Sequence, residues 1–106
     1  MKEKEKLYFD ERAKMIKAMA HPTRLYILTK LKEAEHCVCE LTEMLGFDAS
    51  TISKHLSVLK NAGLVSDDKR GLNVYYRLEN PCILDILECV DSAIRKKLKS
   101  QMNMLK

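Results

Sequence analysis

Two cysteines separated by a single residue, Cys37-Val38-Cys39, are the strongest chemical signal in the sequence. Thiolate sulfur binds thiophilic metals and metalloids, and paired thiols can also be oxidised. Residues two apart on a regular helix point about 200° from each other. Both thiols can therefore hold one ion only if this segment is the non-helical start of a helix, or if binding distorts its first turn.

Cys82 and Cys89 form a second candidate pair, seven residues apart in a segment with helical periodicity. This spacing puts them on one face of a helix but about 10 Å apart along its axis, so they need a ligand from another segment or chain to share an ion. A buried cysteine can also act as a small apolar side chain, and the sequence supports that role equally well. The third ligand for Cys37 and Cys39 is open among Cys82, Cys89, His36 and an external thiol.

The composition indicates one small globular domain over residues 1–106, with 46% hydrophobic and 32% charged residues. The net charge of +4 weakly favours a nucleic-acid partner. No apolar run could cross a bilayer, and the amino end mixes acids with bases, unlike a secretory signal. We expect a cytoplasmic protein without a membrane partner, whose cysteines are free thiols.

Periodicity predicts four helices, a hairpin and a long last helix. The helices are expected over about 7–20, from Pro22 onward, 38–45 and 49–62, and the last over about 82–102. Gly46 and Gly63 are typical of helix ends, and Asp48 is a good helix cap. The hairpin, or wing, is expected over about 64–78 with its turn at 67–71. The order predicts a mainly α fold, a winged helix-turn-helix with five helices and a helix-turn-helix over about 38–62.

The charges are sorted along the chain in a way that favours DNA binding. Residues 33–48 contain five acids and no lysine or arginine, whereas residues 49–66 contain no acid. A recognition helix must offer hydrogen-bond donors and avoid carboxylates that phosphates would repel. The helix over 49–62 meets this demand, and its candidate DNA-binding residues are Ser50, Thr51, Ser53, Lys54 and His55. Lys69 and Arg70 are candidate backbone contacts on the wing, partly offset by Asp67 and Asp68.

The first and last helices each carry an apolar stripe that a domain of this size cannot easily cover. We therefore expect a homodimer that pairs through these two helices. Such a dimer would bind two half-sites of double-stranded DNA about 34 Å apart.

Three segments together resemble the ArsR/SmtB family of bacterial and archaeal metal-sensing repressors: AMAHPTRLYIL, CVCELTEMLGFDASTISKHLSVLKNAGLV and VYYRL. The resemblance covers about residues 13–98. It implies a homodimeric winged-helix repressor that leaves its operator when an inducer binds. The DNA-binding residues named above match the family's recognition helix and wing.

The same resemblance bears on the inducer. Arsenite-type and cadmium/lead-type members contain the Cys-Val-Cys that Cys37 and Cys39 reproduce. The arsenite pattern commonly adds a third cysteine where Thr42 stands here, and cadmium-type members use further thiols from an amino-terminal arm that has none in this chain. The zinc/cobalt-type site lacks its partners, because Asn80, Ala93 and Lys96 occupy the ligand positions. The resemblance therefore implies a dissociable thiophilic inducer, As(III) or Sb(III) before Cd, Pb or Zn, and no organic cofactor.

Alternative functions use the same residues differently. A redox or reactive-sulfur sensor would oxidise the cysteines in place of binding an ion. An enzyme is not expected, because the sequence has no Gly-rich phosphate loop, no paired catalytic carboxylates and no evident base for a nucleophilic cysteine. A winged helix that binds protein is disfavoured by the acid-free segment 49–66.

Overall fold

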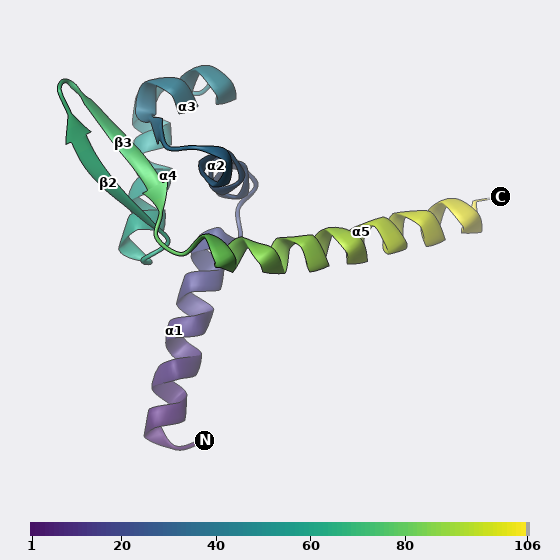
Figure 1. The fold of residues 1–106 in the computed structure, drawn as a ribbon. Coiled ribbons are helices and arrows are strands. Elements are labelled where there is room, and N and C mark those ends of the chain that lie inside the picture. The colour runs from purple at the N-terminus through teal and green to yellow at the C-terminus, as the bar shows by residue number, and fades with distance from the viewer. Residues whose placement is uncertain (106) are drawn as a thin grey trace.

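A computed structural model describes residues 1–105 of the chain (Figure 1). Within them the fold contains five α-helices, a short 3-10 helix and three strands. In chain order these are α1 (Glu3–Met19), α2 (Pro22–Glu33), β1 (His36–Cys37), α3 (Val38–Leu45), α4 (Ala49–Asn61), β2 (Val65–Arg70), β3 (Asn73–Leu78), the 3-10 helix η1 (Pro81–Leu84) and α5 (Asp85–Met104). The predicted winged helix-turn-helix is confirmed.

The core forms where α2, α3 and α4 meet the base of the hairpin. Its most deeply buried side chains are aliphatic, namely Ile27, Leu28, Leu41, Ile52, Leu56, Leu59 and Leu64. The predicted stripe of α4 at positions 52, 56 and 59 therefore faces inward, as the 3.6-residue period requires. Burying this stripe leaves the polar side of α4 in solvent.

The helix-turn-helix is bounded by residues whose backbone chemistry suits the turn. Gly46 ends α3 in the left-handed region at φ 73°, where a side chain would be strained. Asp48 then begins α4, and its Oδ1 accepts a hydrogen bond from the Thr51 N–H at 2.7 Å. This bond holds the pKa of the Asp48 carboxyl below its usual value. The predicted ends of both helices are confirmed.

The sheet differs from the sequence prediction in two ways. The strand order is β1-β3-β2, so that the two-residue β1, which was not predicted, pairs antiparallel with β3 through His36↔Tyr76 and Cys37↔Tyr75. The predicted turn at 67–71 is wrong, because β2 continues to Arg70 and pairs there with Asn73, leaving a two-residue turn.

Ion pairs explain why acidic residues lie within β2 and not in the turn. Asp67 lies 3.0 Å from the Nζ of Lys60, and Asp68 accepts a hydrogen bond from the Nε of Arg70 at 3.1 Å. Gly71, at φ 64°, allows the tight reversal. The wing is therefore a long hairpin with charged sides.

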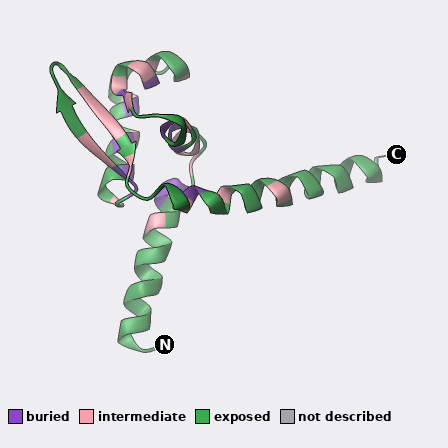
Figure 2. Cartoon of the chain, in the orientation of Figure 1, coloured by how far each residue is buried: buried purple, intermediate pink, exposed green. Residues whose placement is uncertain are grey.

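The helices α1 and α5 extend away from the core as two arms (Figure 1). Both are exposed over most of their length (Figure 2). The radius of gyration is 16.7 Å, compared with about 13 Å for a compact domain of 100 residues. No helix within residues 1–105 has the length and apolar character needed to cross a bilayer.

Candidate nucleic-acid interface and thiol site

The outward side of α4 presents short polar side chains and a lysine. Ser50, Ser53 and Lys54 are exposed, and Thr51 is half-buried beside its N-terminal cap. No acidic residue occurs between Ala49 and Asn61. This side of α4 therefore offers donors and one positive charge without a carboxylate, which is what contact with base edges and phosphates requires.

His55 does not share that outward side. It is half-buried, its ring centroid lies 4.6 Å from that of His21, and its Nδ1 lies 3.3 Å from the Nη1 of Arg24. Burial, then the neighbouring His21 and Arg24, lower the pKa of His55 below its usual value. The structure thus separates His55 from the other predicted DNA-binding residues and places it at the contact between α4 and the start of α2. The helical period contains this signal, since residue 55 is three positions from the buried Ile52.

On the wing, Lys69 is exposed but Arg70 is already paired. The Nη2 of Arg70 donates to Glu35 at 2.7 Å, and its guanidinium carbon lies 4.8 Å from the centre of the Tyr75 ring. Hydrogen bonds to Glu35 and then Asp68 raise the pKa of Arg70 above its usual value. Sequence reasoning did not identify Glu35 as the partner, because it precedes Arg70 by 35 residues.

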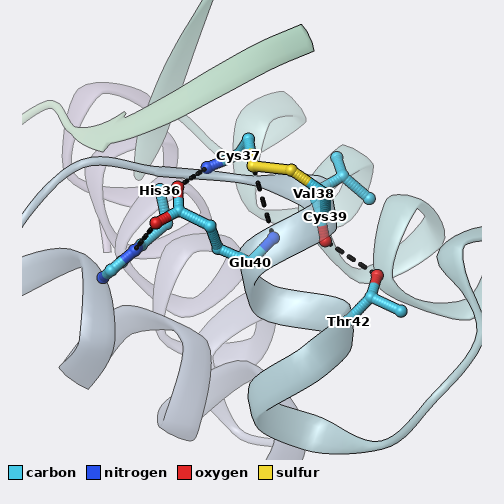
Figure 3. The surroundings of a disulfide bond; sticks show 6 residues. All are labelled: His36, Cys37, Val38, Cys39, Glu40 and Thr42. Carbon is cyan, nitrogen blue, oxygen red and sulfur yellow. Dashed lines mark hydrogen bonds and ion pairs between the residues drawn. A yellow bond between two sulfur atoms is a disulfide. The ribbon is translucent and has the colours of Figure 1, made fainter.

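Cys37 and Cys39 lie together at the start of α3 and form a disulfide (Figure 3). This corrects the expectation that all four cysteines are free thiols. Cys37 is the N-cap of α3 with an extended backbone (φ −83°, ψ 165°), so its side chain does not follow helical geometry. Its Cα lies 5.3 Å from that of Cys39 in the first turn. The two sulfur atoms can therefore meet, as the non-helical start considered above would allow.

A capping box surrounds the buried sulfur of Cys37, which is only 2% exposed. The Glu40 N–H donates to the Sγ of Cys37 at 3.3 Å, and the Cys37 N–H donates to the Oε1 of Glu40 at 3.0 Å (Figure 3). That second bond is the main cause of a lowered pKa at Glu40, and His36, 3.5 Å from Oε2, contributes further. A sulfur atom therefore takes the place that a serine or threonine oxygen usually has in this motif.

Cys82 and Cys89 are free and exposed, Cys82 in η1 and Cys89 in α5. In a single chain neither is a buried apolar residue. Across residues 1–105, no three histidine, cysteine or acidic side chains come together in a group that could hold a metal ion. The four predicted metal ligands are therefore brought together only as the pair Cys37 and Cys39.

The cysteine pair lies next to elements that contact the wing and α4, the two parts of the candidate DNA-binding surface. Cys37 ends β1, which pairs with the wing strand β3 opposite Tyr75. It also begins α3, which packs against α4. A change at the Cys37 sulfur therefore falls on two elements: β1, which pairs with the wing strand β3, and α3, which packs against α4.

A family model described as bacterial regulatory protein, arsR family, matches residues 21–67. The transcriptional repressor SmtB of Mycobacterium tuberculosis is 38% identical over 65% of this chain and 51% of its own length. An HTH-type transcriptional regulator of Methanocaldococcus jannaschii is 37% identical over 78% of this chain and 94% of its own length. The arsenic resistance regulator ArsR1 of Pseudomonas putida is 43% identical over 60% of this chain and 51% of its own length. The chain thus spans about half the length of two of these three relatives.

Two solved structures extend the similarity over most of the chain. A homodimeric winged helix-turn-helix DNA-binding domain from Mycobacterium bovis, described as a possible ArsR-family regulator, superposes with a TM-score of 0.81 at 27% identity, over 94% of this chain and 93% of that one. Reduced HlyU from Vibrio cholerae gives a TM-score of 0.75 at 29% identity, over 84% and 97%. The relatives named here are described as transcriptional regulators or as the DNA-binding domain of one, apart from HlyU, whose name states no function.

Proposed function

Because this chain belongs to the ArsR family of bacterial regulatory proteins, we propose that it is a homodimeric transcriptional repressor that leaves operator DNA when an inducer binds Cys37 and Cys39. It is a regulator and not an enzyme, and it acts in the cytoplasm, where the operator is accessible. The observation that carries the proposal is that the Cys37 sulfur is itself the N-cap acceptor of α3.

In the DNA complex, the amino-terminal half of α4 enters the major groove. Ser50, Thr51 and Ser53 contact base edges or phosphates, and Lys54 neutralises a phosphate. Lys69 on the wing contacts the backbone from the side. Arg70 joins it only when Glu35 releases the Nη2 of its guanidinium, since that carboxylate holds Nη2 in the free protein while Asp68 holds Nε.

The trigger works through the start of α3. Once the disulfide between them is reduced, Cys37 and Cys39 would hold the inducer as thiolates. A bond to the Cys37 sulfur would compete with the hydrogen bond that the Glu40 N–H donates to it. The N-cap of α3 is then weakened and β1 shifts against β3. Because α3 packs against α4, the donors on α4 lose their alignment with the groove. A coupling free energy of about 1–3 kcal/mol is enough for a 5- to 150-fold loss of affinity.

The family resemblance, and not the thiol chemistry by itself, favours As(III) or Sb(III) as the inducer. Trivalent arsenic binds thiolates, and the pair supplies two of them, with an external thiol as the third ligand. The similarity to a regulator described as acting in arsenic resistance is consistent with this choice, and the similarity to a homolog of a cadmium resistance regulator keeps cadmium as the main competitor. Cd, Pb and Zn accept the same sulfur ligands and are tested beside it.

The decisive experiment measures operator binding by fluorescence anisotropy with reduced, metal-free protein. Arsenite, antimonite, cadmium, lead and zinc are added one at a time. Cys37→Ser and Cys39→Ser should bind DNA like the wild type but fail to dissociate. Cys82→Ser and Cys89→Ser are the matched controls and should respond normally. Full release of Cys37→Ser by every effective ion would overturn the site assignment.

A redox sensor is the second candidate, favoured by the disulfide between Cys37 and Cys39. A peroxide would oxidise the two thiols: the sulfur–sulfur bond forms, the oxygen–oxygen bond breaks, and for hydrogen peroxide two water molecules leave. Both hydrogen bonds of the capping box are present in the disulfide form, so the start of α3 is ordered when the pair is oxidised. We therefore rank it second. It would replace the first proposal if peroxide released chelator-treated protein from DNA and no ion did.

A further inference from the structure

A hollow of about 340 Å³ lies where α1, α2 and α4 meet, away from the cysteine pair. Its lining comes from α1 (Lys14, Lys17, Ala18), α2 (Arg24) and the carboxyl-terminal end of α4 (Val58, Asn61, with Ala62 just beyond it). The volume is at the lower end of the range for small-molecule sites, about 300–1,000 Å³.

The charge of this hollow is all of one sign. Three of the seven lining residues are cations and none is an acid. Within the part of the chain that the structure describes, neither Lys14, Lys17 nor Arg24 forms an ion pair, whereas Lys60 and Arg70 on the wing side each have a carboxylate partner. Three unneutralised cations around one concave surface favour an anionic ligand.

Arg24 is fixed in place before any ligand arrives. Its Nε donates to the backbone carbonyl of Ala18 at 2.6 Å, and its Nη1 contacts His55. These two contacts leave Nη2 without a hydrogen-bond partner among residues 1–105. A pre-positioned guanidinium with a free donor suits a carboxylate or phosphate group, because little side-chain entropy is lost on binding.

The remaining lining is apolar, from Ala18, Val58 and Ala62, with the amide of Asn61 beside them. A free inorganic anion would leave this apolar surface uncovered. We propose that the hollow is a second ligand site, for a small organic anion with one acidic group and a compact apolar body.

Such a ligand would bridge the recognition helix and the two helices behind it. Val58 and Asn61 belong to α4, whereas Lys17 belongs to α1 and Arg24 to α2. Occupation would bind α4 to α1 and α2 and so favour one orientation of α4. The site is separate from the thiol pair, and its ligand could be bound with or without the inducer.

The test uses the reduced protein of residues 1–106 without DNA, so that it is independent of the repressor proposal. Sodium benzoate is the probe, titrated by isothermal calorimetry or by NMR chemical shifts. Benzyl alcohol, which lacks the charge, and inorganic phosphate, which lacks the apolar body, are the comparison ligands. Benzoate should saturate, and both comparison ligands should bind at least about tenfold more weakly.

Lys14→Gln/Lys17→Gln should weaken benzoate binding by about tenfold or more, because two of the three cations are gone. Lys2→Gln/Lys4→Gln removes the same charge from the far end of α1 and should change it by less than about twofold. Thermal unfolding of both variants establishes that they are folded.

The proposal is overturned if benzoate does not saturate, if phosphate binds equally well, or if both double variants lose the same affinity. It is also overturned if the wild-type protein does not bind benzoate and Lys14→Gln/Lys17→Gln binds DNA more weakly than the wild type, with a smaller salt dependence. That result would make the hollow a contact for the DNA backbone.

Discussion

At the scale of single residues, the ion pair between Glu35 and Arg70 determines whether Arg70 is available to DNA. The carboxylate of Glu35 lies 2.7 Å from Arg70, on the loop that leads into Cys37. A DNA phosphate would have to displace this carboxylate to reach the guanidinium. We therefore propose that Glu35 competes with DNA for Arg70 on the wing.

We predict that Glu35→Gln strengthens operator binding and makes it more sensitive to salt. Glu35→Gln frees the Nη2 of Arg70, while its Nε stays bonded to Asp68. The freed end of the guanidinium adds about one phosphate contact, so the slope of log K against log salt should become steeper by about one unit. Glu33→Gln, which removes the same charge but leaves Arg70 paired, is the control. Equal salt slopes for Glu35→Gln and Glu33→Gln would show that Glu35 does not compete with DNA for Arg70.

Lys54 gives the opposite prediction at the recognition helix. Lys54→Ala should weaken binding to all DNA sequences alike and lower the salt slope by about one unit, because it removes a phosphate contact and no base contact. Lys97→Ala on α5 removes the same charge and should leave the slope unchanged. An unchanged slope for Lys54→Ala would exclude Lys54 as a phosphate contact.

His55 makes stability depend on pH. Its folded-state pKa lies below the ordinary value of 6.5, mainly because of burial and then because of His21 and Arg24. The unfolded chain therefore binds more protons once the pH falls below 6.5. The contribution of His55 is fully present above that pH and declines below it.

Urea unfolding at several pH values between about 7.5 and 5 tests this prediction. The free energy of unfolding should fall with pH in the wild type, and His55→Gln should flatten the decline. An identical decline in both proteins would assign the effect to other groups.

At the scale of elements, the sequence predicted a helix end correctly where the residues at that end determine it by themselves. Gly46 and Asp48 marked the turn between α3 and α4, and both act there as predicted. The strand β1 was missed because its two residues are defined only by pairing with β3, about 39 positions away. Likewise, Asp67 and Asp68 suggested a turn because their partners, Lys60 and Arg70, could not be assigned from spacing alone.

The same distinction holds for the candidate site. The sequence allowed the sulfur atoms of Cys37 and Cys39 to meet if Cys37 stood at the non-helical start of a helix. The structure has this geometry, because Cys37 is the N-cap of α3. The pairing of Arg70 with Glu35 depends on the tertiary fold and had no local signal.

Gly46 provides an element-scale prediction. Gly46→Ala should lower the free energy of unfolding by about 1 kcal/mol, because an L-residue is strained in the left-handed region. Nothing lies within 4 Å of an added Cβ, so the cost is that of the backbone alone. Gly46→Asn, which tolerates this conformation better, should cost less in thermal or urea unfolding. Equal losses would point to a packing effect instead.

At the scale of the whole molecule, the arms carry exposed apolar side chains that a single chain does not cover. On α5, Val90, Ile94 and Leu98 are 47%, 46% and 53% exposed, and on α1 Leu7 and Phe9 are also open to solvent. A twofold partner would bury the apolar sides of both arms. The solved domain from Mycobacterium bovis with the same fold is described as homodimeric.

We predict that Ile94→Glu converts the dimer into monomers and lowers operator affinity by about a hundredfold or more, since one half-site is then bound at a time. Lys96→Gln changes the net charge by the same amount on another side of α5 and should remain dimeric. Sedimentation and anisotropy measure the two effects. A dimeric Ile94→Glu would place the interface elsewhere.

The two extended arms have one more consequence, which concerns the lifetime of the protein in the cell. A lone protomer offers two bare helices to proteases, whereas a paired one hides them, so survival rises with the number of copies already made. Newly synthesised chains at low abundance would be cleared before they find each other. Above a threshold they would persist, and the level of repressor would switch on sharply with its own synthesis.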